Sequence, residues 1–407
     1  MRPPHIHPSK HLNGVHYEIR GGLARKAEEL ERAGFEIIKL NIGNPGAFGF
    51  RMPETMRRAI VENLAQAEPY CHQKGIFPAR EAVVMQQQDR GVMDVSADDV
   101  FIGNGVSELI MMCTRALLNP GDEVLIPSPD YPLWTAAVTI HGGKPVHYPC
   151  RPERGFTPDP EEVEALVTDR TRAIVVINPN NPTGAVYSRE TLTGLADLAN
   201  RRHLVMFADE IYDEMLYDGA EHVPMATLAR HTLCGTFSGL SKVYRACGLR
   251  VGWVSFSGEK AHARDYLNGI ELLASLRLCA TVPGQWAVQT ALGGYQSIFE
   301  LTSPGGRLHQ TRATLLKGVA ESQYLELAPP MGAMYAFVRV NGSLTNGFDD
   351  EQFALDLLQQ KHVLIAPGRS FNVDYHTHFR TTLLPESPLM KHVLAMIEEL
   401  LDEYADG

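Results

Sequence analysis

Short apolar runs alternate with amphipathic segments through the middle of the chain. Turn residues bound five runs that we expect to be strands, at residues 100–103, 123–127, 172–178, 203–209 and 232–238. Helical spacing follows the first run, where the apolar face is formed by Leu109, Met112, Cys113, Ala116 and Leu117. Strands separated by helical segments of this length predict right-handed βαβ crossovers and a mostly parallel sheet with helices on both faces. We therefore expect a large domain over residues 50–295.

The two ends of the chain show a different pattern. An amphipathic segment around Leu23, Ala27 and Leu30 and a strand over 37–42 precede residue 50. After residue 300, we expect strands over 335–340, 363–366 and 379–384, followed by a closing helix with Leu389, Val393, Ile397, Leu400 and Leu401 on one face. This order favours a smaller α+β domain formed from both termini, residues 1–49 and 296–407. The predicted fold class is α/β.

Composition and charge narrow the class of protein. The 407 residues are 44% hydrophobic and 21% charged, which is typical of soluble globular proteins. The net charge of −11 argues against nucleic acid or an anionic membrane surface as a partner, although local basic sites could still bind small anions. The sequence has neither a signal peptide pattern in its first ten residues nor an apolar run near the roughly 20 residues that a membrane span needs. We expect a cytoplasmic protein.

Cysteine and histidine residues give no sign of a metal site. The six cysteines are scattered, without a C-x-x-C pair or a Cys/His cluster. His376 and His378 would share a face of a strand, but neither a cysteine nor a carboxylate joins them in the sequence pattern. We expect both to be surface residues and predict no bound metal.

Polar motifs follow four of the predicted strands. In open α/β sheets, ligands bind outside the carboxyl ends of the strands, so these motifs are candidate site residues. They are G-N-G-V-S-E at 103–108, N-P-N-N-P-T-G at 178–184, D-E-I-Y at 209–212, and S-G-L-S-K at 238–242 with Arg250 eight residues further on. Taken singly, each has an ordinary structural reading as a helix cap, a rigid loop, a half-buried tyrosine or a surface lysine. The first motif also lacks the third glycine of a dinucleotide fingerprint, because Glu108 stands there.

Taken together and in this order, the motifs resemble those of the fold type I pyridoxal-phosphate-dependent aminotransferases of class I/II, over essentially the whole chain. I-G-N-P at 42–45, G-N-G-V-S-E-L-I at 103–110, P-D-Y-P-L-W-T-A-A-V at 129–138 and F-S-G-L-S-K-V-Y-R at 237–245 are similar, more narrowly, to bacterial glutamate–pyruvate (alanine) aminotransferases. The resemblance implies a ping-pong transfer of an amino group between L-alanine and 2-oxoglutarate, giving pyruvate and L-glutamate. It also implies pyridoxal 5′-phosphate as the cofactor.

The resemblance assigns roles toward the cofactor. Lys242 would hold it covalently and carry the substrate proton, and Asp209 would pair with the pyridine nitrogen. Tyr212 and Asn181 would bind the ring O3′, and Tyr131 would stack on the ring face. The phosphate would be held by Gly105, Val106, Ser107, Ser241 and Arg250.

One position departs from the common family form. Many relatives carry Ser-x-Ser-Lys, whereas Gly239 stands at the first serine position here and Ser238 lies one residue earlier. Ser238 is therefore a doubtful phosphate ligand.

Further family positions concern the substrate and a partner subunit. Arg380 would grip the substrate α-carboxylate, with Gly43 and Asn181 as further contacts. Tyr70 matches the tyrosine that reaches the phosphate of the neighbouring subunit, which implies a homodimer with shared active sites. We also hypothesise that Tyr17 and Arg20, in H-Y-E-I-R-G, fold over the pocket and help to read the side chain of glutamate.

Alternative activities remain open within the same fold. A transaminase of valine, methionine or aromatic amino acids, or a C–S β-lyase, would keep Lys242, Asp209 and Arg380. A pyridoxal-phosphate-binding transcription regulator is disfavoured, because only some fifty residues precede the large domain and the chain is acidic. A nicotinamide dehydrogenase is disfavoured by Glu108 at the third glycine position.

Overall fold

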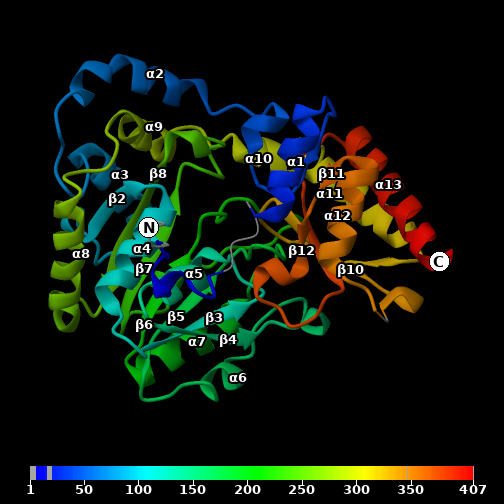
Figure 1. Cartoon of the computed structure of the whole chain (residues 1–407). Coiled ribbons are helices and arrows are strands. Elements are labelled where there is room, and N and C mark those ends of the chain that lie inside the picture. The colour runs from blue at the N-terminus through cyan, green and yellow to red at the C-terminus, as the bar shows by residue number, and fades with distance from the viewer. Residues whose placement is uncertain (1–5, 16–20, 346, 407) are drawn as a thin grey trace, which may run out of the picture.

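A seven-stranded sheet forms the centre of the computed structural model, which describes residues 6–15, 21–345 and 347–406 (Figure 1). The spatial order is β2-β8-β7-β6-β5-β3-β4, and β8 alone runs antiparallel to its neighbours. The strands are β2 (Val100–Asn104), β3 (Glu123–Ser128), β4 (Lys144–Pro149), β5 (Thr171–Ile177), β6 (Val205–Asp209), β7 (Leu233–Gly239) and β8 (Val251–Gly258).

Helices cover both faces of this sheet. Along β5, Ile174 and Val176 pack into one apolar cluster, whereas Ala173, Val175 and Ile177 pack into another. The second cluster includes residues of α4 (Val106–Leu117), α5 (Leu133–Ile140) and α8 (Arg264–Leu276). The first includes residues of α2 (Glu54–Glu62), α3 (Phe77–Asp89), α6 (Pro160–Glu164), α7 (Arg189–Arg202) and α9 (Ala287–Gly293). Burial on both faces explains why the strand sequences are continuous apolar runs rather than alternating ones.

The C-terminal part of the chain forms a second sheet with its own helices. Its four strands are antiparallel in the order β12-β13-β10-β9, namely β9 (Leu325–Glu326), β10 (Tyr335–Val340), β12 (Ala366–Pro367) and β13 (His378–Thr382). The helices of this part are α10 (Ile298–Thr302), α11 (Arg307–Glu321), α12 (Asp350–Lys361) and α13 (Ser387–Asp406). The short 3₁₀ helix η12 (Gly368–Phe371) follows β12 directly.

The N-terminal segment packs against this C-terminal part. Strand β1 (Ile38–Lys39) pairs in parallel with β11 (Val363–Leu364), and α1 (Gly22–Arg32) contacts α12. Figure 1 shows α1, in blue, beside the orange and red C-terminal elements. The segment then crosses to the large sheet through α2. A small domain bounded at residues 49 and 296 stays a prediction, although this pairing supports it.

The predicted fold class is confirmed, and the five expected central strands lie within two residues of their predicted bounds. Two strands of the seven-stranded sheet were not anticipated, and neither was the short β9 of the second sheet. β4 begins at Lys144 and carries Pro145, His147 and Pro149, and β8 was interpreted only as a motif around Arg250. The surface prediction is wrong for His378, which is 3% exposed because it lies on β13 under the stacked ring of Phe337. His376 is exposed as expected.

Among the described helices, none is both long and apolar enough to cross a bilayer.

Candidate active site

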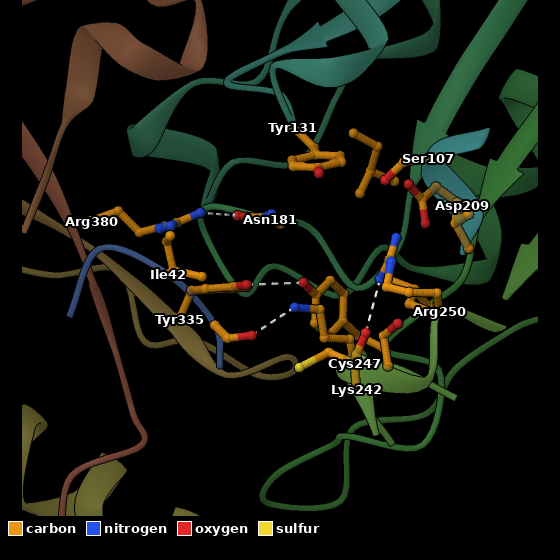
Figure 2. A pocket seen from close by; sticks show the side chains of 16 residues that line it. Ile42, Ser107, Tyr131, Asn181, Asp209, Lys242, Cys247, Arg250, Tyr335 and Arg380 are labelled. Atoms are coloured by element: carbon orange, nitrogen blue, oxygen red, sulfur yellow. Dashed lines mark hydrogen bonds between the residues drawn. The ribbon is translucent and has the colours of Figure 1, made fainter. Parts of the chain in front are cut away.

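One pocket gathers the polar motifs at the carboxyl ends of β5, β6 and β7 (Figure 2). The N-terminal segment at Ile42 and Gly43, together with β10 and β13, closes it from the other side. The predicted site residues that line the pocket are Gly43, Val106, Ser107, Tyr131, Asn181, Asp209, Tyr212, Ser241, Lys242, Arg250 and Arg380. Sequence positions more than 300 residues apart therefore meet in one cavity.

Asp209 ends β6 and is 3% exposed. The indole Nε1–H of Trp134 donates to its Oδ2 at 3.0 Å. Its Oδ1 is buried and has no hydrogen-bond partner within the part of the chain that the structure describes. Burial raises the pKa of this carboxyl to about 6, although the Trp134 hydrogen bond opposes the shift. A buried carboxylate oxygen facing a cavity without a partner is suited to a ligand that donates an N–H.

An anion-binding cradle lies at the N-terminus of α4. Gly105 precedes the helix with φ 82°, a conformation that favours glycine, and a Cβ there would displace the guanidinium of Arg250. No described side chain caps α4, and the first helical N–H groups have no partner within the helix. Arg250 is held beside them by its donations to the Asn104 carbonyl at 3.2 Å and the Cys247 carbonyl at 2.9 Å. Amides, a helix dipole and a guanidinium converge here on one small volume.

The Lys242 amine lies between the large sheet and the small one. Its Nζ donates to the Gly43 carbonyl at 2.8 Å (Figure 2). The hydroxyl of Tyr212 donates to that of Tyr335 at 3.1 Å. Burial would raise the pKa of the Tyr335 phenol, but the Lys242 ammonium and the Arg380 guanidinium lower it overall, whereas burial raises the pKa of Tyr212. Of the two phenols, Tyr335 therefore gives up its proton more readily.

Arg380 is buried on β13, with 1% exposure. Its Nη1 donates to Oδ1 of Asn181 at 2.8 Å, and its Nη2 donates to the Asn41 carbonyl. The guanidinium carbon lies 4.3 Å from the ring centroid of Tyr335 and 4.7 Å from that of Phe371. Two aromatic rings and two oxygen acceptors thus orient the planar cation, which is the group best suited to a carboxylate.

Position 43 needs glycine because the Tyr335 side chain lies close to its backbone, and not because of a turn conformation. A Cβ at this position would lie 2.1 Å from the Tyr335 hydroxyl. Any larger residue would push Tyr335 away from Tyr212 and from the Arg380 face.

The charge of the pocket is opposite to that of the chain. Among the described lining residues, Lys242, Arg250 and Arg380 are cationic and Asp209 is the one carboxylate. The pocket is therefore suited to an anionic ligand. Across the described ranges, no cluster of three or more His, Cys, Asp or Glu side chains could hold a metal ion.

Some candidate residues lie elsewhere. The Tyr70 side chain is 78% exposed and does not line the pocket. Ser238 faces Trp253 across β7 and β8 and is not a lining residue either, in line with the doubt about its role. Gly105 contributes backbone next to the lining residue Val106. Tyr17 and Arg20 lie outside the described residues.

Besides the apolar lining residues Ile42, Ile177 and Ile211, sequence reasoning missed three side chains of this site. Tyr335 and Cys247 line the pocket. Trp134 is not a lining residue, but its indole N–H donates to the lining residue Asp209. Trp134 lies three residues after Tyr131 within the P-D-Y-P-L-W segment, so that its place at the start of α5 could have indicated a shared site. Tyr335 had no such signal, because it begins a strand of apolar appearance.

The fold and the site define an enzyme of the aminotransferase type. The family model for class I and II aminotransferases matches residues 36–397, and the chain belongs to that family. The predicted family is thereby confirmed.

The chain is similar over nearly its whole length to proteins with a named activity. It is 47% identical to the glutamate-pyruvate aminotransferase AlaA of Escherichia coli K12, over 98% of both chains. It is 48% identical to the alanine aminotransferase of Mycobacterium bovis, over 96% of this chain and 91% of that one. The crystal structure of an aminotransferase from Escherichia coli superposes with a TM-score of 0.96 at 47% identity, covering 98% of this chain and 99% of the other.

Proposed function

We propose that the protein transfers an amino group between L-alanine and 2-oxoglutarate, producing pyruvate and L-glutamate, with pyridoxal 5′-phosphate as its cofactor. The observation that carries this proposal is a buried guanidinium, Arg380, in the same pocket as the amine of Lys242 and the unpartnered Oδ1 of Asp209. A carboxylate site, a nucleophilic amine and an acceptor for a pyridinium N–H are three of the needs of amino transfer. The choice of alanine and glutamate is supported by the names of the relatives at 47–48% identity.

The residues present fit pyridoxal 5′-phosphate at both ends of that molecule. Oδ1 of Asp209 offers an acceptor to the ring nitrogen, and the cradle of Gly105, Val106 and Ser107 with Arg250 offers donors to a phosphate. Ser241 completes that cradle from the turn after β7, and Tyr131 offers its ring to the ring face. When bound, the cofactor supplies a carbonyl carbon that carries the amino group and a ring that takes up the electron pair released at Cα.

Arg380 orients the substrate for proton transfer. Its guanidinium donates parallel hydrogen bonds to the α-carboxylate, and Oδ1 of Asn181 accepts from its Nη1 at 2.8 Å, which fixes the direction of the guanidinium. Alanine, glutamate and their oxo acids all carry this carboxylate, so the same contact serves both halves of the reaction. Fixing the substrate at one end directs its Cα–H toward Lys242.

Lys242 is the base and acid of the reaction. The Gly43 carbonyl accepts from its Nζ at 2.8 Å, which places the amine on the side of the pocket facing Tyr335 and Arg380. The amine would take the proton from the substrate Cα and deliver it to C4′, the carbonyl carbon that the cofactor supplies. Next to this amine, the Tyr212 hydroxyl donates to the Tyr335 hydroxyl. This hydrogen bond fixes the position of the Tyr212 hydroxyl, which would bind O3′ of the cofactor ring.

The quaternary state and cellular location expected from the sequence stay predictions. The exposed Tyr70 is compatible with a role in the phosphate site of a second subunit, and we propose a homodimer on that basis. The cytoplasmic location rests on the sequence pattern alone.

A panel of half-reactions tests the proposal. The cofactor-loaded protein is mixed separately with alanine, glutamate, valine, methionine and phenylalanine, and its visible absorption is followed with time. We expect rapid conversion with alanine and glutamate only, and recovery of the original spectrum when pyruvate or 2-oxoglutarate is added. Lys242→Ala serves as the matched control and should show no conversion.

Two results would redirect the assignment. Faster conversion with phenylalanine or methionine than with alanine would identify a transaminase of other amino acids. Release of pyruvate and ammonia from a thioether amino acid without any oxo acid would identify a C–S β-lyase.

A further inference from the structure

A buried polar network joins the large sheet to the C-terminal part beside the pocket. Asp130 is fully buried, and its carboxylate is the centre of the network. Oδ2 accepts from the Thr135 hydroxyl at 2.6 Å, and Oδ1 accepts from the Asn372 side-chain amide at 2.7 Å. Thr135 in turn lies 2.9 Å from Nε2 of His147. Both oxygens of Asp130 are therefore satisfied, one by each side of the junction.

The backbone reinforces the same junction. The N–H of Asp130 donates to the Phe371 carbonyl at 3.1 Å, and the Ser128 hydroxyl donates to the Asn372 carbonyl at 2.7 Å. Asn372 ends η12 with φ 56°, a left-handed conformation that asparagine and glycine adopt at low cost. The chain between Ser128 and Tyr131 is thus bonded to the turn at 371–372 through three hydrogen bonds, which are donated by the Ser128 hydroxyl, the Asp130 N–H and the Asn372 side-chain amide.

Each end of this network lies next to a residue that lines the pocket. Tyr131 follows Asp130 directly and lines the pocket, as Figure 2 shows. Phe371, whose carbonyl Asp130 binds, places its ring 4.7 Å from the Arg380 guanidinium. A displacement of the 371–372 turn would move the ring on which Arg380 lies.

We propose that Asp130 is a positioning residue that fixes the Arg380 guanidinium relative to Tyr131 by binding Asn372 and Phe371 across the junction. This inference rests on the proposed function, in which Arg380 binds the α-carboxylate. Asp130 touches neither substrate nor cofactor in this arrangement. Asp130 holds Tyr131, beside the large sheet, at a fixed distance from Arg380, on the small sheet. The substrate is bound at its α-carboxylate by Arg380, so this keeps its Cα at one position relative to Tyr131.

The choice of variants separates positioning from general stability. Asn372→Gly removes the amide donor but keeps the backbone conformation, since glycine tolerates φ 56°. Asp130→Asn keeps an oxygen for Asn372 and turns the other group into a donor to the Thr135 hydroxyl.

A control variant comes from the start of β3, the strand that ends two residues before Asp130. Glu123 begins β3, is 2% exposed, and bonds Thr168 at 2.6 Å and Lys144 at 3.0 Å. Glu123→Gln therefore disturbs a buried carboxylate of β3 away from the pocket. Thermal unfolding of every variant shows which of them retain the fold.

The experiment measures carboxylate binding and kinetics together. The dissociation constant of glutarate, a dicarboxylate without amino or oxo group, is measured by calorimetry on the cofactor-loaded protein. We expect Asn372→Gly to weaken glutarate binding about tenfold, the effect of losing one hydrogen bond to a charged group. KM for alanine and for 2-oxoglutarate should rise by the same factor while kcat changes less, and Asp130→Asn should stay close to the parent protein.

Arg380→Gln separates the proposed carboxylate site from the positioning role of Asp130. If Arg380→Gln leaves glutarate binding unchanged, the carboxylate site of the proposed function is wrong. If Arg380→Gln abolishes binding but Asn372→Gly behaves like Glu123→Gln, the positioning role of Asp130 is overturned and the proposed function stands. A fall in kcat with unchanged KM and unchanged glutarate binding would also overturn it.

Discussion

The pocket has two ends that are built in different ways. The Asp209 end, formed by Ser107, Asp209, Ser241 and Arg250, comes from strand ends of one sheet and the segments next to them. The Arg380 end, formed by Gly43, Asn181, Tyr335 and Arg380, combines the N-terminal segment, a loop of the large sheet and two strands of the small sheet. The hydrogen bonds of Arg380 span 199 and 339 residues of sequence.

This difference bears on rigidity and on function. Neighbouring strands fix the Asp209 end through their backbone ladder, so its geometry follows once the sheet forms. The geometry of the Arg380 end depends on the relative position of the two sheets. A small displacement of one sheet against the other changes how Arg380 binds the substrate carboxylate. We therefore expect changes at the Asp209 end to act on the chemistry, and changes at the Arg380 end to act on substrate binding.

The largest effect is expected where the two ends meet, at Lys242. Lys242→Ala removes the amine that moves the proton, and kcat should fall by about 10⁴-fold, the upper range for general acid–base catalysis. The turnover of alanine with 2-oxoglutarate measures this loss. Residual activity within tenfold of the parent protein would remove Lys242 from the mechanism.

Asp209→Ala tests the Asp209 end. Loss of a buried charge that stabilises the ring nitrogen should lower kcat about 10²- to 10³-fold, as for other preorganised electrostatic contacts. KM for alanine and 2-oxoglutarate should change little, because Arg380 is untouched. Steady-state kinetics on protein saturated with cofactor provide the measurement, and a rise in KM with unchanged kcat would break the comparison.

Arg380→Lys tests the other end. Lysine keeps the charge but loses the planar fork, so kcat/KM should fall about 10- to 100-fold, the range for lost hydrogen bonds to a charged group. The fall should be equal for alanine and 2-oxoglutarate, since both present the same carboxylate. A loss confined to one of the two substrates would show that Arg380 reads the side chain instead.

Trp134→Phe sharpens the comparison with a smaller change. The indole N–H lowers the pKa of Asp209 against the effect of burial, which raises it to about 6. Without that donor the pKa rises further, so Asp209 becomes neutral at a higher pH than before. Because the charged form is the one that binds a pyridinium, the acid limb of cofactor affinity should move to higher pH, with kcat reduced about tenfold. The dissociation constant of pyridoxal 5′-phosphate, measured from pH 5 to 8, checks the direction, and an unshifted limb would contradict it.

The sequence predicted the Asp209 end more completely than the Arg380 end, for a physical reason. Lys242, Asp209 and Ser107 lie within a few residues of a strand terminus, and a parallel sheet brings such termini together. Arg380 and Gly43 were assigned only through the family resemblance, because no local pattern indicates that β13 meets the segment at 41–43. Tyr335 and Trp134 escaped prediction because aromatic residues on a strand or helix most often belong to the core.

The fold shows the same limit. The buried parallel strands were evident as continuous apolar runs, whereas β8 was hidden by its glycines and by the motif around Arg250. His378 was expected at the surface because neither a cysteine nor a carboxylate joins it and His376 in the sequence pattern, but the rings of Phe337, Phe156 and Tyr375 pack against it and it is buried. Burial of a polar residue on a short strand depends on what packs over it, and that information is not local.

One paired measurement tests the two-ended pocket most directly. For Asp209→Ala and Arg380→Lys, the dissociation constant of pyridoxal 5′-phosphate and that of glutarate are measured on the same preparations, with glutarate added to cofactor-saturated protein. We predict that Asp209→Ala weakens binding of the cofactor and leaves glutarate affinity within about twofold, and that Arg380→Lys does the reverse. Equal losses of both affinities in both variants would contradict the account, because they would show that the two ends form a single cooperative unit.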